Sequence, residues 1–154
     1  MELSAILSPD AVRVDINVSS KKRLLQEMAE LAAAQYGLNA EQVFAAMQER
    51  ESLGPTGMGG GVAIPHARLP ELDRVVGLFA TLQKAVDFEA VDRRAVDLVF
   101  VLLAPEEAGA AHLRALAKVS RTLRDASICE KLRSATDTSA LYALLTDAEA
   151  SKAA

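Results

Sequence analysis

The sequence predicts an α/β fold in which helices cover both faces of a mixed β-sheet. Near the N-terminus, apolar residues alternate with polar ones, as in a half-buried strand. Two later segments are almost continuously apolar, as in strands covered on both faces, and helical periodicity occurs before and after them. The link between these two segments is too short for a long helix, so we expect the sheet to be mixed.

The first third of the chain is predicted to form one strand and two helices. Valine and isoleucine alternate with polar residues over 12–18, which indicates the strand. Apolar residues over 24–32 follow i, i+3 and i+4 spacings, and Gly37 is a natural C-terminal stop for this helix. Asn39 is typical of the N-cap of a second helix, which should end near Arg50.

The second half is predicted to form two strands followed by three helices. The strands are expected over Val75 to Leu82 and Val96 to Leu103. Helical spacing then returns over 108–124, and two shorter helices are expected at about 128–135 and 139–146. The stripe expected to face the core in the longest of these helices consists of Leu113, Leu116, Ala117, Ser120 and Leu123.

Length and composition favour one cytoplasmic domain. We expect a single domain over residues 1–154, with a frayed tail at 147–154 that has nothing to pack against. The formal net charge of −4 argues against nucleic-acid binding, which needs a basic patch. The single cysteine, Cys129, suits a reducing compartment. The longest apolar run, 96–105, falls short of the ~20 residues that span a bilayer, and no export signal begins the chain.

A glycine-rich segment, 53–61 (LGPTGMGGG), interrupts all periodicity. A phosphate-binding P-loop would require lysine and a hydroxyl residue where Gly60 and Gly61 stand, and a dinucleotide fingerprint would require glycine at Val62. The segment also follows a predicted helix, whereas both motifs follow a strand. These residues alone therefore disfavour a nucleotide site, and a mobile turn is their simplest interpretation.

The chain contains two histidines, His66 and His112. Pro65 favours an extended backbone before it, so His66 is expected at a strand end, where α/β sheets carry functional groups. From the residues alone, an ordinary loop imidazole is the favoured interpretation of His66, and a solvent-facing helix residue is the favoured interpretation of His112. The adjacent Glu106 and Glu107 have no nearby His or Cys, so we expect no metal site there.

Residues 50–68 (RESLGPTGMGGGVAIPHAR) resemble the phosphorylation-site segment of the EIIA proteins of the phosphotransferase system, in the fructose/mannitol and nitrogen-regulatory class. The likeness is collinear from about Leu7 to Leu145. Residues 20–33 resemble the family's first long helix, and residues 86–125 resemble its central strands and the helix with a second histidine. The pattern is closest to the nitrogen-regulatory branch. The resemblance implies a sheet of about five strands between helices.

The resemblance also implies roles for individual residues. His66 would be the phosphoryl acceptor, His112 the second histidine of the site, and Arg50 an arginine beside it. Thr56 matches a hydroxyl residue of the glycine loop, whereas Pro55 stands where the family usually has Ser or Thr, so one hydroxyl contact is lost.

Elementary chemistry agrees with these roles. Imidazole is mostly neutral at cytoplasmic pH, so it can attack phosphorus, and phosphoryl transfer depends chiefly on positioned donors. Consecutive backbone N–H groups can form an anion-binding nest. We therefore expect Thr56, Gly57, Gly59 and Gly60 to bind the phosphoryl oxygens, without a metal or cofactor.

The expected activity is that of a phosphotransferase-system component, a carrier rather than a stand-alone turnover enzyme. The resemblance implies HPr or its nitrogen-branch paralogue as the donor, and a role mainly in nitrogen regulation. One alternative is sugar transport, with phosphate passed to a fructose/mannitol-type EIIB domain. Another is an interaction module that is never phosphorylated. Candidates for an apolar docking patch are Met58, Ile64, Leu69 and Leu72.

Overall fold

Six strands form one mixed sheet in the computed structural model, which describes residues 1–153 and the side chains of residues 1–147. The strands are β1 (Leu7–Ile16), β2 (Gly57–Gly59), β3 (Val62–Ala63), β4 (His66–Leu69), β5 (Val76–Val86) and β6 (Val96–Pro105). Their order is β1-β5-β6-β3-β2, and β4 also pairs with β6. Strand β5 runs antiparallel to β6, whereas β1 is parallel to β5, and β3 and β4 are parallel to β6. The expected mixed sheet is confirmed.

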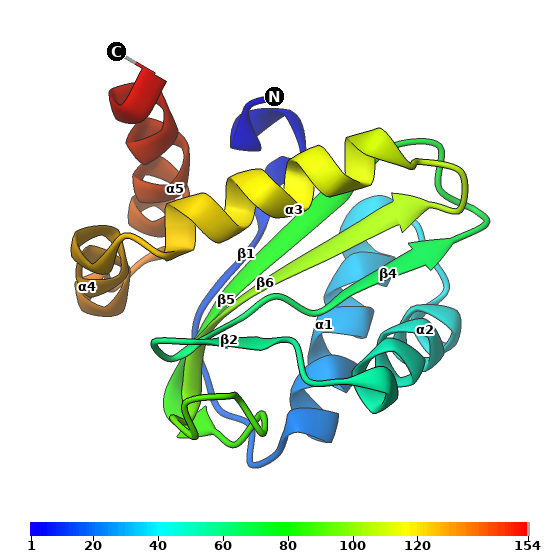
Figure 1. Cartoon of the computed structure of the whole chain (residues 1–154), viewed down its shortest axis with the longest axis horizontal. Helices are drawn as coiled ribbons and strands as arrows, with labels where there is room; N and C mark the ends of the chain where they lie inside the picture. Colours follow the sequence, from blue (N-terminus) through cyan, green and yellow to red (C-terminus); the bar gives the residue numbers. More distant parts are fainter. Residues whose placement is uncertain (154) are drawn as a thin grey trace.

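Helices cover both faces of this sheet, as expected. They are η1 (Leu3–Ala5), α1 (Lys21–Tyr36), α2 (Ala40–Leu53), α3 (Ala110–Leu123), α4 (Ala126–Ser134) and α5 (Thr138–Ala153). Figure 1 shows α3 crossing in front of the strands, while α1 lies behind them. Helix α2 packs against α1 and β4, and α5 packs against β1 and α4. Between the layers lies a continuous apolar core that includes Phe79, Phe88 and Phe100.

The boundaries of the first two helices follow from their capping residues. The Ser20 side chain accepts a hydrogen bond from the first turn of α1, and Gly37 ends that helix with a φ of 69°, in the left-handed region that favours glycine. Asn39 caps α2 in the same way as Ser20 caps α1. Helix α2 continues past Arg50, its expected end, to Leu53, because the first glycine after it is Gly54.

The glycine-rich segment forms a small hairpin instead of a structureless turn. Strand β2 pairs antiparallel with β3, and β3 adds to β6 in parallel. Gly59, Gly60 and Gly61 between them all have positive φ, at 94°, 68° and 80°. Three successive residues in this region require glycine, which explains the composition of the segment. The hairpin occupies an edge of the sheet, where its short strands are tolerated.

The buried face of α3 differs from the expected stripe. Its buried residues are His112, Ala115, Val119, Thr122 and Leu123, so Leu123 alone of the predicted set lies in that group. Leu113 is 65% exposed, and Ala117 is exposed too. Two neighbouring faces of this helix both satisfy the i, i+3, i+4 spacing. The face with more apolar residues is the more exposed one, so the spacing predicts the wrong buried face. The correction matters because it turns His112 towards the sheet.

The C-terminal region forms α4 and α5 close to the two short helices expected there. The fraying expected for 147–154 falls largely on residues whose side chains lie outside the described part of the chain. Cys129 is buried, and burial raises the pKa of its thiol. No helix within the described residues is both long enough and apolar enough to cross a membrane.

Candidate active site at His66 and His112

His66 is the first residue of β4 and lies at the break between β3 and β4. Its Cα pairs with that of Leu102 in the centre of β6, and the preceding Pro65 carbonyl accepts a hydrogen bond from the Leu102 N–H, at 3.0 Å. The residue is half-buried. The rigid strand pairing beneath it fixes the backbone from which the imidazole projects.

One ring nitrogen of His66 is committed to the backbone. Its Nδ1 lies 2.8 Å from the Ile64 carbonyl oxygen. A carbonyl oxygen can only accept, so Nδ1 carries the proton and the lone pair of the neutral ring is on Nε2. The nitrogen of His66 that has a free lone pair is therefore Nε2.

His112, in the first turn of α3, faces the His66 ring. The two ring centroids are 5.6 Å apart, and the rings are steeply inclined, at 74°. His112 is 6% exposed, and its Nε2 is buried without a hydrogen-bond partner among the described residues. Folding thus brings together the only two histidines of the sequence.

Burial favours the neutral form of both imidazoles. Burial lowers the pKa of His66 below its ordinary value of 6.5, and the positive charge of Arg50 lowers it further, although the bond to the Ile64 carbonyl and the charge of Glu51 act in the opposite direction. Burial also lowers the pKa of His112, with contributions from His66 and Arg68. Two neutral rings in contact can supply a nucleophile and a hydrogen-bond partner side by side.

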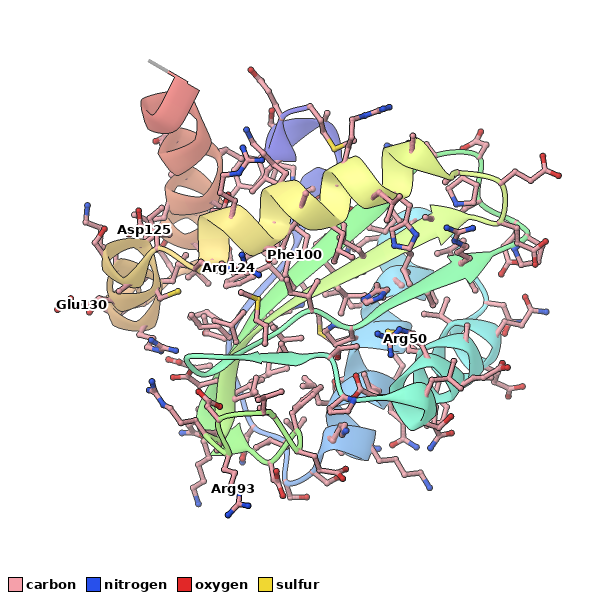
Figure 2. The ribbon with its side chains drawn as sticks, in the orientation of Figure 1. Arg50, Arg93, Phe100, Arg124, Asp125 and Glu130 are labelled. Carbon is pink, nitrogen blue, oxygen red and sulfur yellow. The ribbon has the colours of Figure 1, made fainter. Side chains whose placement is uncertain are left out.

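Arg50 lies close enough to influence His66 electrostatically. It belongs to the last turn of α2, and Figure 2 shows its side chain on the side of α2 that faces the start of β4. Its Nη1 donates to the Gly54 carbonyl at 2.9 Å. Because a guanidinium has five N–H donors, this bond anchors the side chain and leaves donors for a bound anion.

Sequence reasoning missed Glu51 and Lys21, which lie behind Thr56. Glu51 and Thr56 are both buried, at 9% and 8% exposure. The Thr56 N–H lies 3.1 and 3.2 Å from the two Glu51 carboxylate oxygens, the Thr56 hydroxyl donates to Oε1, and Lys21 Nζ donates to Oε2 at 2.9 Å. Thr56 therefore uses its donors on Glu51, and the expectation that its Oγ1 binds phosphoryl oxygens needs correction. In the sequence, Glu51 is indistinguishable from the solvated carboxylates near it.

The glycine turn lies away from His66, which corrects the expectation for Gly59 and Gly60. The Gly61 carbonyl accepts from the start of β6, whereas His66 pairs with its centre. Along extended chain, five residues correspond to about 16 Å. The Gly60 N–H also donates to Asp92 Oδ2 at 2.9 Å, so it is not a free donor.

Gly57 also has a packing reason to be glycine. A Cβ at this position would lie 2.9 Å from the Ala90 Cβ and 3.3 Å from the Phe88 Cβ. These two residues belong to the connection between β5 and β6, which packs over the hairpin. Pro55 is exposed and has no backbone N–H, so it adds no donor either.

The apolar patch expected around His66 is wrong in two of its members. Ile64 and Leu69 are core residues, at 4% and 2% exposure. Met58 and Leu72 are partly buried and pack against the core. The large apolar side chains that are exposed next to site residues in the sequence are Leu53, at 81%, and Leu113, at 65%.

Comparisons with known proteins agree with this architecture. Residues 5–148 match the family described as phosphoenolpyruvate-dependent sugar phosphotransferase system, EIIA 2. The nitrogen regulatory protein of Bradyrhizobium diazoefficiens is 49% identical over 145 residues, which cover 94% of this chain and 95% of that protein.

Two solved structures have a similar fold. The crystal structure of the nitrogen regulatory protein IIA-Ntr from Neisseria meningitidis has a TM-score of 0.87 and 37% identity, covering 92% of this chain and 97% of that one. IIA mannitol from Escherichia coli has a TM-score of 0.76 over 90% of this chain and 97% of its own. At 23% identity, this second likeness concerns the fold alone.

Proposed function

Because the chain belongs to the EIIA 2 family of the phosphoenolpyruvate-dependent sugar phosphotransferase system, we propose that it is a phosphohistidine carrier that accepts a phosphoryl group on His66. The donor is an HPr-like protein, either HPr itself or its nitrogen-branch paralogue. The observation that carries this proposal is the arrangement of the His66 ring, with Nδ1 bound to the Ile64 carbonyl and the other face next to His112. It provides one fixed nucleophilic nitrogen in a site that favours the neutral ring.

In the proposed step, the Nε2 lone pair of His66 attacks the phosphorus of the donor's phosphohistidine. The new N–P bond forms as the donor's N–P bond breaks, and that electron pair returns to the donor imidazole. His66 Nδ1 keeps its proton, so the phosphorylated ring carries positive charge, which the Ile64 carbonyl stabilises. The bonds formed and broken in this step balance without a metal ion or an external base.

Arg50 and His112 stabilise the negative charge of the transferred phosphoryl group. The guanidinium of Arg50 offers donors to the equatorial oxygens, where negative charge is concentrated. A buried polar group without a partner costs about 1–3 kcal/mol. His112 Nε2 is such a group, and a bond to a phosphoryl oxygen on His66 would satisfy it.

A regulatory role is supported by the relatives named nitrogen regulatory proteins, which this chain matches over nearly its full length. In such a role, the presence or absence of phosphate on His66 is the signal that a target protein distinguishes. Transfer onward to an EIIB domain would instead make the chain a sugar-transport component. Rates of transfer from the phosphorylated chain to fructose- and mannitol-type EIIB domains measure the second role directly.

The deciding experiment incubates the chain with phosphoenolpyruvate, the first enzyme of the system and the carrier protein. We expect one phosphoryl group per chain, labile in acid and stable in base, and none in His66→Ala. Cys129→Ala serves as a matched control, because this buried thiol is outside the site and its loss should leave phosphorylation intact. Wild-type protein that stays unmodified would refute the proposal and favour the interaction module.

A further inference from the structure

Glu51 occupies a position that is unfavourable for a carboxylate. It lies in the last turn of α2, where the helix dipole disfavours negative charge, and its side chain is 5% exposed. A buried carboxylate is tolerated only when it is paired and hydrogen-bonded. Lys21 and Thr56 meet these requirements, since one supplies the opposite charge and the other supplies two hydrogen-bond donors.

From this carboxylate a series of hydrogen bonds leads to the His66 ring. Glu51 accepts from both the N–H and the hydroxyl of Thr56. The Thr56 carbonyl accepts from the Ile64 N–H at 3.1 Å, and the Ile64 carbonyl accepts from His66 Nδ1 at 2.8 Å. The two intermediate residues, Thr56 and Ile64, are each bonded on both sides, so the series is continuous from Glu51 to the imidazole.

The series matters because Ile64 lies between two strands rather than within one. Strand β3 ends at Ala63 and β4 begins at His66, so Ile64 and Pro65 lie in the gap between them. Pro65 restricts Ile64 to extended backbone, and so narrows the directions in which the Ile64 carbonyl can point. Two bonds flank the Ile64 carbonyl: the Ile64 N–H donates to the Thr56 carbonyl, and the Pro65 carbonyl accepts from β6.

We propose that Glu51 is a positioning residue for the phosphoryl acceptor. By holding Thr56, it directs the Ile64 carbonyl at His66 Nδ1 and so keeps the reactive lone pair on Nε2. Lys21 completes the unit, since its ammonium compensates the buried carboxylate and also lies 5.2 Å from the centre of the Phe88 ring. This inference rests on the proposed role of His66, but it concerns the orientation of the ring and can be measured without any phosphoryl donor.

The test compares Glu51→Ala with Glu49→Ala, which removes an exposed carboxylate from the same helix. Imidazole ¹⁵N NMR spectra at pH 8 report which nitrogen of His66 carries the proton. We expect wild-type protein and Glu49→Ala to show protonated Nδ1, and Glu51→Ala to show a mixture of tautomers. Phosphorylation of Glu51→Ala should be about tenfold slower, as expected for a misplaced nucleophile.

A folded Glu51→Ala with wild-type spectra and rate would overturn the proposal, and so would an equal loss in Glu49→Ala. The double variant Lys21→Met/Glu51→Gln keeps a neutral acceptor for Thr56 and covers the case in which Glu51→Ala unfolds. Protonated Nδ1 in this double variant shows that the carboxylate charge is dispensable; Lys21→Met/Glu51→Leu, which removes the charge and the acceptor together, should then give a mixture of tautomers, and protonated Nδ1 in that variant contradicts the proposal. If wild-type protein is not phosphorylated at all, the proposed function fails, while the spectra still decide the role of Glu51.

Discussion

The imidazoles of His66 and His112 lie with their centroids 5.6 Å apart and their planes inclined at 74°, which directs the edge of one ring at the other. His66 comes from the start of a strand and His112 from the start of a helix on the sheet, so only the folded chain creates this pair. His66 Nδ1 is bonded to the backbone, whereas His112 Nε2 has no partner within the described residues. The pair is therefore asymmetric, as the proposed phosphoryl transfer requires: the His66 ring is held by the backbone, and His112 has a ring nitrogen without a partner among the described residues.

This asymmetry predicts the effect of removing His112. We expect His112→Ala to slow phosphorylation of His66 by about a hundredfold, the usual loss when one donor to a developing charge is deleted. The fold should persist with some loss of stability from the vacated space, because the removed Nε2 makes no hydrogen bond within the described residues. Rapid-quench kinetics with phosphorylated carrier protein, together with circular dichroism, measure both effects. Unaltered kinetics in the folded variant would remove His112 from the site.

Arg50 is predicted to act on both the rate and the pKa of His66. The positive charge of Arg50 lowers the pKa of His66, so Arg50→Gln should raise it, and the loss of guanidinium donors should slow phosphorylation on the order of a hundredfold. An NMR titration of the His66 ring and single-turnover kinetics check the two parts. Arg124 is an exposed arginine just after the C-terminal end of α3. Arg124→Gln should therefore change neither the pKa of His66 nor the rate of phosphorylation. An unchanged titration of His66 in Arg50→Gln would place Arg50 outside the site.

The lowered pKa values predict how stability depends on pH. Both histidines protonate near their ordinary value of 6.5 in the unfolded chain, but only at lower pH in the folded protein. Protons therefore bind preferentially to the unfolded state once the pH falls below 6.5. The stability associated with the neutral rings is present above pH 6.5 and is lost as the pH falls through the lower native pKa values.

Urea unfolding at pH 7.5 and pH 5.5 measures this dependence. The free energy of unfolding should be smaller at the lower pH, and the difference should shrink in His66→Gln and His112→Gln. The rate of phosphorylation should also be lower at pH 5.5 than at pH 7.5, because the protonated His66 ring has no lone pair to attack phosphorus. A wild-type stability that rises towards pH 5.5, or a pH dependence that survives both substitutions, would contradict the assignment.

Local sequence signals were sufficient for much of this fold. Ser20, Gly37 and Asn39 mark helix ends through bonds and backbone angles that involve only their neighbours, and their predictions are confirmed. The apolar segment that becomes β6 is recognisable because a central strand is buried on both faces. These features depend on short-range geometry, which the sequence displays directly.

Other features depend on contacts between distant segments, and the sequence does not display them. The buried carboxylate of Glu51 is compensated by the ammonium of Lys21, which is far away in the chain. The residues next to Glu51 in the sequence do not distinguish it from Glu49. The face of α3 that packs on the sheet is likewise set by tertiary contact, so helical spacing alone could not choose between Leu113 and His112. The composition of the glycine turn favours phosphoryl binding, whereas its distance from His66 is fixed by the register on β6.

The position of the glycine turn leads to a prediction that separates folding from phosphoryl binding. Gly61 has a φ of 80°, and a Cβ there would lie 2.6 Å from Arg133 Nη2 and 3.1 Å from Asp97 Oδ1. These two side chains form an ion pair at 2.9 Å, and Arg133 Nη2 also donates to the Gly60 carbonyl at 2.8 Å. Gly61→Ala should therefore disturb this clamp and destabilise the chain by about 2 kcal/mol.

Phosphorylation of folded Gly61→Ala should nevertheless stay within about twofold of wild type, because the site at His66 is about 16 Å away along the strand. Gly60→Ala is the matched control, since its Cβ would meet no atom within 4 Å and only the backbone strain at a φ of 68° remains. We expect Gly60→Ala to lose less stability than Gly61→Ala in urea unfolding. A Gly61→Ala protein with wild-type stability but little phosphorylation would show that the glycine turn contacts the phosphoryl group after all, and that the hairpin moves towards His66 when the donor binds.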